Sequence, residues 1–261
     1  MKAKYLLALS LFIELASCSE NKGTKSNSGE VDLESAIENA ESRRKADPDA
    51  SGGNKCLLDY QAKYDQILSE ADVLTATGFS KDVMETKSNK TLKNPEHHEF
   101  IYKFKNGRVS KTGIAKGLPM PDVVKIGNIK AISLSAFEST YRAISDEEMK
   151  VAKDALNNAA DGKSGDAEAD AAVKKAEDQN VSKEQVKELG SGIMDVMKEV
   201  SKGYTNVEGL GDAAVWNTVT SELFVLQNGV KFEIRTDISN DTEKNKSVAI
   251  GLAKTILDKC K

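Results

Sequence analysis

The chain has 261 residues, with 37 basic and 41 acidic side chains, a formal net charge of −4 and an isoelectric point near 5.5. This balance argues against a nucleic-acid-binding protein, which normally presents a basic face. The length suits one large domain or two small ones, and no apolar stretch after the first residues is long enough to cross a bilayer.

The first residues have the pattern of a secretory signal peptide. Lys2 and Lys4 form a basic start, and an apolar run over residues 5–13 follows them. That run is too short to span a membrane. The next segment, Leu15-Ala16-Ser17-Cys18, consists of an aliphatic residue, two small residues and a cysteine. It resembles the lipobox of bacterial lipoproteins.

The resemblance implies that residues 1–17 are removed as a signal peptide and that lipid on Cys18 then holds the chain on a membrane. Each buried methylene of an acyl chain contributes about 0.8 kcal/mol to such anchoring. Ser19 after the cysteine resembles lipoproteins sent to the outer membrane. The expected location is therefore the bacterial cell envelope, and a plain signal peptide cut elsewhere is the alternative.

Residues 18–55 are polar and rich in Ser, Gly, Asn and Lys, which is typical of a flexible tether. Residues 31–46 have a sparse helical pattern, so a helix that docks on the domain is the alternative. From Cys56 to Ala71 apolar residues follow helical spacing and predict one helix.

A strand is predicted over residues 99–104, where large apolar residues alternate, and Asn106-Gly107 after it favours a type I′ hairpin. Residues 123–126 and 129–134 are predicted as two strands around Gly127-Asn128, and residues 135–144 as a short helix.

A helical insertion is predicted at about residues 145–203. Ser145 and Ser182 each begin a capping-box pattern, and after the second one apolar residues recur at helical spacing. Between these segments, residues 161–180 have almost no large apolar side chain, which indicates a solvated and mobile segment, with a solvated helix as the alternative.

The C-terminal part is predicted to contain strands over residues 215–220, 223–226 and 230–238, followed by a helix capped by Asp241. Asn228-Gly229 is a second type I′ signal. Residues 56–261 are thus predicted to form an α+β domain: an antiparallel sheet with Asn-Gly hairpins and helices packed on one face. The order of elements hints at a duplicated half-unit.

The segment from Val207 to Trp216, with the hairpin and Ala-rich helix after it, resembles the C-terminal part of small secreted lipoproteins of uncharacterised families. This resemblance covers about a fifth of the chain. It implies a cellular location and a fold but no activity.

Cys56 and Cys260 lie on the apolar faces of the first and last predicted helices of the domain. If these helices lie antiparallel on the sheet, the start of one meets the end of the other. We therefore predict a disulfide, since exported proteins meet an oxidising compartment. Two buried thiols are the alternative.

Two motifs suggest chemistry that their context does not support. Residues 209–214 match G-x-G-x-x-A, but dinucleotide binding requires a strand before the glycines and a helix after them. His97 and His98 can each pair with one glutamate, Glu99 and Glu96 respectively. No third histidine is present to complete a zinc site. We therefore expect no cofactor and no metal.

The leading functional hypothesis is a non-enzymatic binding or interaction module displayed on a lipid anchor. Its expected partners are the membrane, through the lipid on Cys18, and another envelope protein. The alternative is an envelope hydrolase that uses carboxylates. A concave pocket with convergent carboxylates would favour the hydrolase, whereas a filled core with an exposed apolar patch would favour the interaction module.

Overall fold

The computed structural model describes residues 53–111, 116–165, 167–178 and 180–261. The predicted signal peptide, Cys18 and nearly all of the predicted tether therefore lie outside the described residues. The chain divides into two compact units. The helical unit is Ala143–Glu199, and the sheet unit comprises the described residues up to Arg142 together with Val200–Lys261.

The sheet unit contains a seven-stranded, fully antiparallel sheet with the strand order β1-β2-β3-β7-β6-β5-β4. The strands are β1 (Met84–Asn89), β2 (Glu99–Phe104), β3 (Asp122–Ala131), β4 (Tyr204–Asn206), β5 (Ala213–Asn217), β6 (Glu222–Gln227) and β7 (Val230–Asp237). Two meanders, one from each half of the chain, meet where β3 pairs with β7. The predicted α+β class is confirmed.

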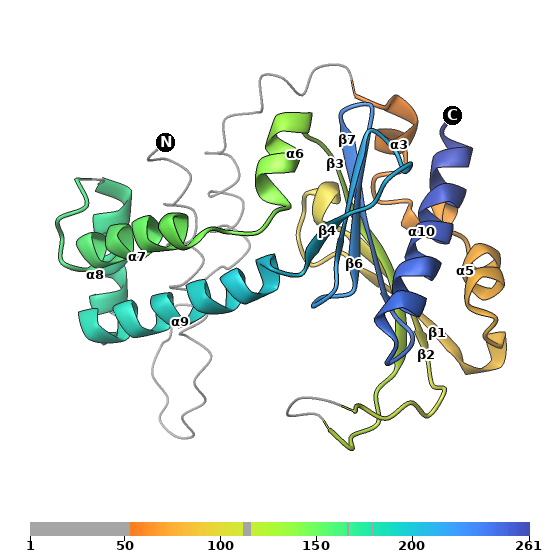
Figure 1. The fold of residues 1–261 in the computed structure, drawn as a ribbon, viewed down its shortest axis with the longest axis horizontal. Helices are drawn as coiled ribbons and strands as arrows, with labels where there is room; N and C mark the ends of the chain where they lie inside the picture. The colour runs from red at the N-terminus through yellow and green to blue at the C-terminus, as the bar shows by residue number, and fades with distance from the viewer. Residues whose placement is uncertain (1–52, 112–115, 166, 179) are drawn as a thin grey trace. The chain divides into compact units, whose positions relative to one another are not determined.

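One face of the sheet is covered by α3 (Lys55–Asp59), α4 (Tyr64–Ile67), α5 (Glu70–Thr77) and α10 (Thr242–Lys259). Figure 1 shows α5 and α10 on one side of the strands and α6 (Leu134–Thr140) on the other. The predicted layer of helices is therefore present, and α6 adds a short helix to the opposite face.

The main core lies between the first layer of helices and the sheet. Alternate residues of each strand point into it, as the period of two requires. Its largest side chains are Leu57, Ile67, Tyr102, Phe104, Ile126, Trp216, Leu223 and Phe232.

The predicted single helix over residues 56–71 is wrong, because the structure has three short helices there. Ala62 has φ +62° and separates α3 from α4. This left-handed conformation cannot continue a right-handed helix. Ser69 then begins α5 with a capping box that includes Asp72.

The two Asn-Gly predictions have different outcomes. Asn228 and Gly229 have φ values of +47° and +72° and join β6 to β7, as a type I′ turn requires. Asn106 does not have a positive φ, and a long connection follows it before β3 begins. The predicted tight hairpin at Asn106-Gly107 is therefore wrong.

The two strands predicted around Gly127-Asn128 form one strand, β3, with a register shift between Gly127 and Lys130. Asn128 has φ +53° at this irregularity. Residues 132–134 are not part of the strand, because Ser133 caps α6. Strands β1 and β4 were not predicted.

The helical unit consists of α7 (Asp146–Ala160), α8 (Ala167–Asp178) and most of α9 (Lys183–Ser201). The Ser145 capping box is confirmed, and Ser182 and Gln185 exchange the two hydrogen bonds expected of the second. The segment predicted as solvated forms α8 and buries Val173 and Ala176.

The halves of the chain do not repeat one another in detail. The first contributes three strands to the sheet and the second contributes four. If the halves were duplicates, a two-fold axis perpendicular to the sheet would relate the antiparallel strands β3 and β7 where the halves meet. Such an axis keeps equivalent helices on the same face of the sheet. Helices α6 and α10, which follow the last strand of each half, lie on opposite faces, so the hint of duplication gains no support.

Candidate functional site: the disulfide pole and the second face of the sheet

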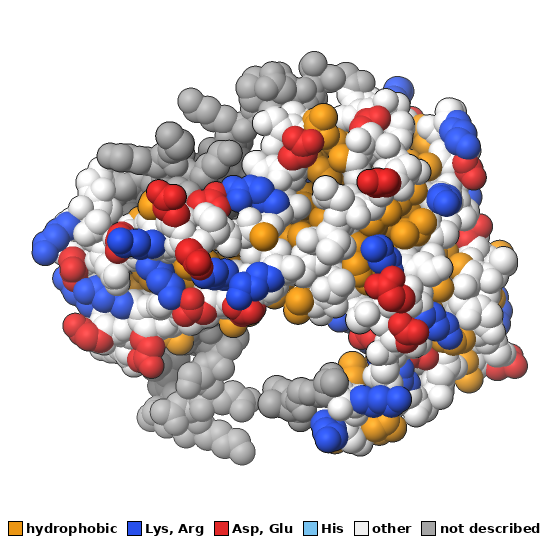
Figure 2. Space-filling model, in the orientation of Figure 1, with side chains coloured by type: hydrophobic (Ala, Val, Ile, Leu, Met, Phe, Trp, Pro, Cys, Tyr) orange, Lys and Arg blue, Asp and Glu red, His pale blue; other side chains and the backbone are white. Residues whose placement is uncertain are grey.

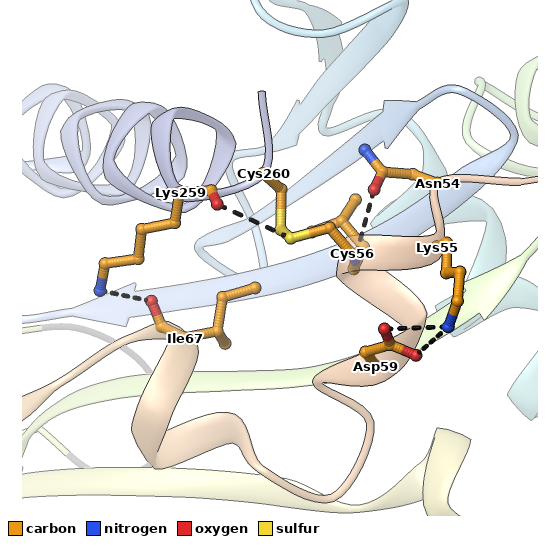
Figure 3. Close-up of a disulfide and its surroundings, with 8 residues drawn as sticks. Asn54, Lys55, Cys56, Asp59, Ile67, Lys259 and Cys260 are labelled. Atoms are coloured by element: carbon orange, nitrogen blue, oxygen red, sulfur yellow. Dashed lines mark hydrogen bonds and ion pairs between the residues drawn. A yellow bond between two sulfur atoms is a disulfide. The ribbon is translucent and has the colours of Figure 1, made fainter.

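Cys56 and Cys260 form a disulfide with their Cα atoms 5.5 Å apart, which confirms the predicted pair. Cys56 is in α3, and Cys260 directly follows α10 (Figure 3). The bridge joins residues separated by 204 positions in sequence, so nearly the whole described chain lies inside the closed loop. It therefore ties the first described element to the last.

Hydrogen bonds extend this attachment around the bridge. The Asn54 side chain caps α3, and its backbone N–H donates to the carbonyl of Asn228 at 2.8 Å. Lys259, before the second cysteine, donates to the carbonyl of Ile67 at 2.8 Å and pairs with Asp72 at 2.7 Å. Figure 3 shows Lys259 reaching from α10 toward Ile67. We call this end of the sheet unit, from Gly53 to Cys56 with Asn228 and Cys260, the disulfide pole.

The carboxylate of Asp72 belongs to the same network. Burial alone would raise its pKa, but the hydrogen bonds from Lys259 and Ser69 bring the pKa below its usual value. The charged form is therefore favoured, and it holds α5 against α10.

The second face of the sheet contains a buried lysine, Lys231 on β7, whose side chain is 3% exposed. Its ammonium donates to Glu233 Oε1 at 2.7 Å and to the Tyr141 hydroxyl at 2.8 Å. Burial alone would lower the pKa of Lys231, but Glu233 and Tyr141 hold the pKa above its usual value. Lys231 is therefore a charged structural group and is not suited to act as a nucleophile.

Aromatic rings from three parts of the chain surround this ammonium. The Lys231 nitrogen lies 5.4 Å from the Tyr141 ring centroid and 5.8 Å from that of Phe224, within cation–π range. Tyr141 stacks on Phe224 with centroids 4.2 Å apart, and Tyr204 contacts both rings edge-on at 6.0 Å. Together with Phe137 of α6 these rings form a second small core.

Carboxylates on the rest of this face are paired with cations. Lys125 lies 2.6 Å from Glu99 and 3.9 Å from Glu222. At the strand ends, Arg108 pairs with Asp237 of this face and with Asp122, which has the strand parity of the core residues Val124 and Ile126. Each of these carboxylates therefore has a basic partner.

The histidines lie at the start of β2, where Pro95–His97 forms a short 3₁₀ turn. The predicted partners are wrong: His97 pairs with Glu96 at 3.2 Å, and His98 Nε2 lies 2.7 Å from the carbonyl of Leu92. Within the part of the chain that the structure describes, no group of three or more His, Cys, Asp or Glu side chains could hold a metal ion.

The glycine motif forms the turn between β4 and β5. Strand β4 precedes the glycines and strand β5 follows them, so the helix that dinucleotide binding requires after the glycines is replaced by a strand. A shallow pocket of about 260 Å³ lies beside this turn and is lined by Gly209, Leu210, Lys254, Leu257, Asp258 and Lys261. Its one acidic side chain, Asp258, pairs with Lys261, so the pocket has no convergent carboxylates.

Comparison of the chain with protein-family models, with curated proteins and with solved structures gives no match. Among the described residues, no helix has both the length and the apolarity needed to cross a membrane. The sequence predicted the cysteine pair, but it did not predict the Lys231 cluster. Alternation along β7 indicates that Lys231 faces away from the main core, and only the placement of α6 buries it.

Proposed function

We propose that this chain is a cell-envelope lipoprotein, held on a membrane by lipid on Cys18, and that its folded part is a non-enzymatic binding or interaction module. The disulfide between Cys56 and Cys260 is the observation that carries the proposal. Structural disulfides persist in oxidising compartments outside the cytosol. Of the three cysteines in the chain, two are bonded to each other and the third occupies the lipobox position.

The ion pairing of the charged side chains favours a binding function over a hydrolytic one. Glu99 and Asp237 on the second sheet face are paired with Lys125 and Arg108, and Lys231 is held by Glu233 and Tyr141. Preformed ion pairs of this kind fix a surface and do not supply a free acid or base.

Fractionation of cells that express the protein tests the anchor. Labelled fatty acid should enter the natural chain, and Cys18→Ala should abolish both labelling and normal processing. Cys18 is the only lipid acceptor in the proposal, so an unchanged mature mass in the membrane fraction would overturn it. Cys260→Ala is the matched control, because it removes a cysteine and should leave labelling intact.

A further inference from the structure

The exposed face of α9 carries apolar side chains. Leu189 is 50% exposed, Val196 is 62% exposed and Met197 is 48% exposed. Positions 189 and 196 are seven residues apart and lie on one side of the helix. Gly192 lies between them, and a Cβ atom built there has no neighbour within 4 Å. We call Leu189, Gly192, Val196 and Met197 the α9 stripe.

The side of α9 that adjoins the stripe packs inside the helical unit, and Leu189, Val196 and Met197 are not part of that core. Val186 and Met194 are buried in its core, and Gly190 lies so close to Leu156 of α7 that a Cβ atom would be 2.5 Å from it. Helix α9 is therefore held by its own neighbours, and the α9 stripe is not needed to form this core.

The lysines and two of the glutamates of α9 differ in whether they have partners. All three lysines of α9 pair with carboxylates of the helical unit: Lys183 with Glu177, Lys187 with Asp161 and Lys198 with Asp146. Glu184 and Glu188 are exposed and have no hydrogen bond or ion pair among the described residues. Both lie on the flank of the α9 stripe, because 188 and 192 are one turn apart, as are 184 and 188.

The helical unit as a whole carries a net negative charge. Residues 143–199 contain fourteen acidic and eight basic side chains. Figure 2 shows charged side chains of both signs over this unit, with hydrophobic patches between them. An apolar stripe with unpaired carboxylates beside it, on an acidic unit, complements a surface that is apolar and positively charged.

We propose that the α9 stripe docks a basic amphipathic helix of a partner protein, with apolar residues of the partner on Leu189 and Val196 and its Lys or Arg side chains beside Glu184 and Glu188. Helices bind to one another in this way through anchors at i, i+3, i+4 and i+7. This inference rests on the proposed function of an interaction module and names the class of partner.

The test uses residues 18–261 with Cys18→Ser, so that no lipid is attached. A synthetic 18-residue helix with leucine on one face and lysine on the others is titrated by calorimetry at two salt concentrations. We expect binding that weakens with salt. A peptide with the same leucines and glutamate in place of lysine should not bind, and neither should a lysine peptide with serine in place of leucine.

Leu189→Ser with Val196→Ser should weaken binding at least tenfold. Glu184→Gln with Glu188→Gln should weaken it less and reduce its salt dependence. Val151→Ser is the matched control, because Val151 is 47% exposed on α7 but lies outside the α9 stripe. Circular dichroism checks that each variant remains folded.

Equal binding by the stripe variants and by the Val151 control would overturn the proposal, as would equal binding of the acidic peptide. Self-association of the chain that is lost in the stripe variants would assign the stripe to a second copy. Binding that appears only after residues 18–52 are removed would assign it to the chain's own segment. Either result would overturn the proposal, and neither would change the outcome of lipid labelling at Cys18.

Discussion

The rings of Tyr141 and Tyr204 lie edge-on with their centroids 6.0 Å apart. Tyr141 is the penultimate residue of the sheet unit before the helical unit begins, and Tyr204 follows the return of the chain at Val200. The entry and the exit of the helical unit are therefore joined by a contact within the sheet unit. Insertions with adjacent ends are tolerated because closing them requires little distortion.

We predict that replacement of residues 143–199 by a short Gly-Ser linker leaves the sheet unit folded, with its melting temperature changed by only a few degrees. Thermal unfolding followed by circular dichroism measures this. A longer excision, of residues 143–206, removes β4 and Tyr204 and should cost several kcal/mol more, because it uncovers Phe224. Equal loss in the two excisions would contradict the prediction.

The disulfide should contribute strongly to stability. On the chain-entropy account, closing a loop of about 200 residues stabilises the folded state by about 5 kcal/mol at most, and strain or residual unfolded structure lowers this figure. Cys56→Ser with Cys260→Ser should therefore lower the free energy of unfolding by about 2–5 kcal/mol, as measured in urea. Reductant should destabilise the natural chain by a similar amount and leave the double variant unchanged.

The features that could be predicted from the sequence are those decided locally. Asp241 caps α10 with its own side chain, and Asn228-Gly229 joins two strands that begin directly on either side of it. Asn106-Gly107 has the same letters, but Arg108 next to it reaches Asp122 and Asp237 and fixes a long connection. A tertiary ion pair thus overrides a local turn preference.

The features that could not be predicted depend on distant parts of the chain. Lys231 alternates with apolar residues along β7, a pattern that predicts an exposed side chain. It is buried because α6 and Tyr141 cover it. Edge strand β1 is polar at five of six positions and forms because β2 offers it a hydrogen-bonding partner. The cysteine pair could be predicted although the first helix was predicted too long, because both cysteines occupy apolar positions near the two ends of the domain.

The buried charge of Lys231 gives a second test of the candidate site. Lys231→Met should destabilise the protein by about 3 kcal/mol or more, because it leaves Glu233 partly buried without its cation. Lys231→Met with Glu233→Gln should cost less than the single change, since no unpaired charge remains. Urea unfolding at pH 7 measures both variants, and equal losses would show that packing of the lysine chain, and not its charge, is what matters.

Two tyrosines should make the protein sensitive to alkali. Burial raises the pKa of Tyr64 to about 12, and burial likewise raises the pKa of Tyr204 to about 12, from an ordinary value of 10.0. The folded state therefore favours the neutral phenols. Their contribution is fully present below pH 10 and is lost as the pH rises toward 12, to a limit of about 2.7 kcal/mol for each ring.

Urea midpoints at pH 9, 10 and 11 should fall progressively, with Cys18→Ser in place to exclude thiol exchange. Tyr64→Phe should lower stability at pH 9 by about 1 kcal/mol through the lost hydrogen bond to the Pro95 carbonyl. It should also make the decline with pH shallower. An unchanged slope in both Tyr64→Phe and Tyr204→Phe would contradict this assignment.

Gly209 and Gly211 form a matched pair of sites in the turn before β5. Their φ values are +70° and +64°, so alanine is strained at either position by about 1 kcal/mol. A Cβ atom at Gly209 has no neighbour within 4 Å, whereas one at Gly211 would lie 2.4 Å from the carbonyl oxygen of Leu226. Gly209→Ala should therefore cost about 1 kcal/mol and Gly211→Ala several times that amount, because the backbone of β6 would have to move. Urea unfolding of the two variants measures the difference. Equal costs would mean that the turn moves freely away from β6, contrary to the hydrogen bond from the Asp212 N–H to the Leu226 carbonyl that holds it there at 2.8 Å.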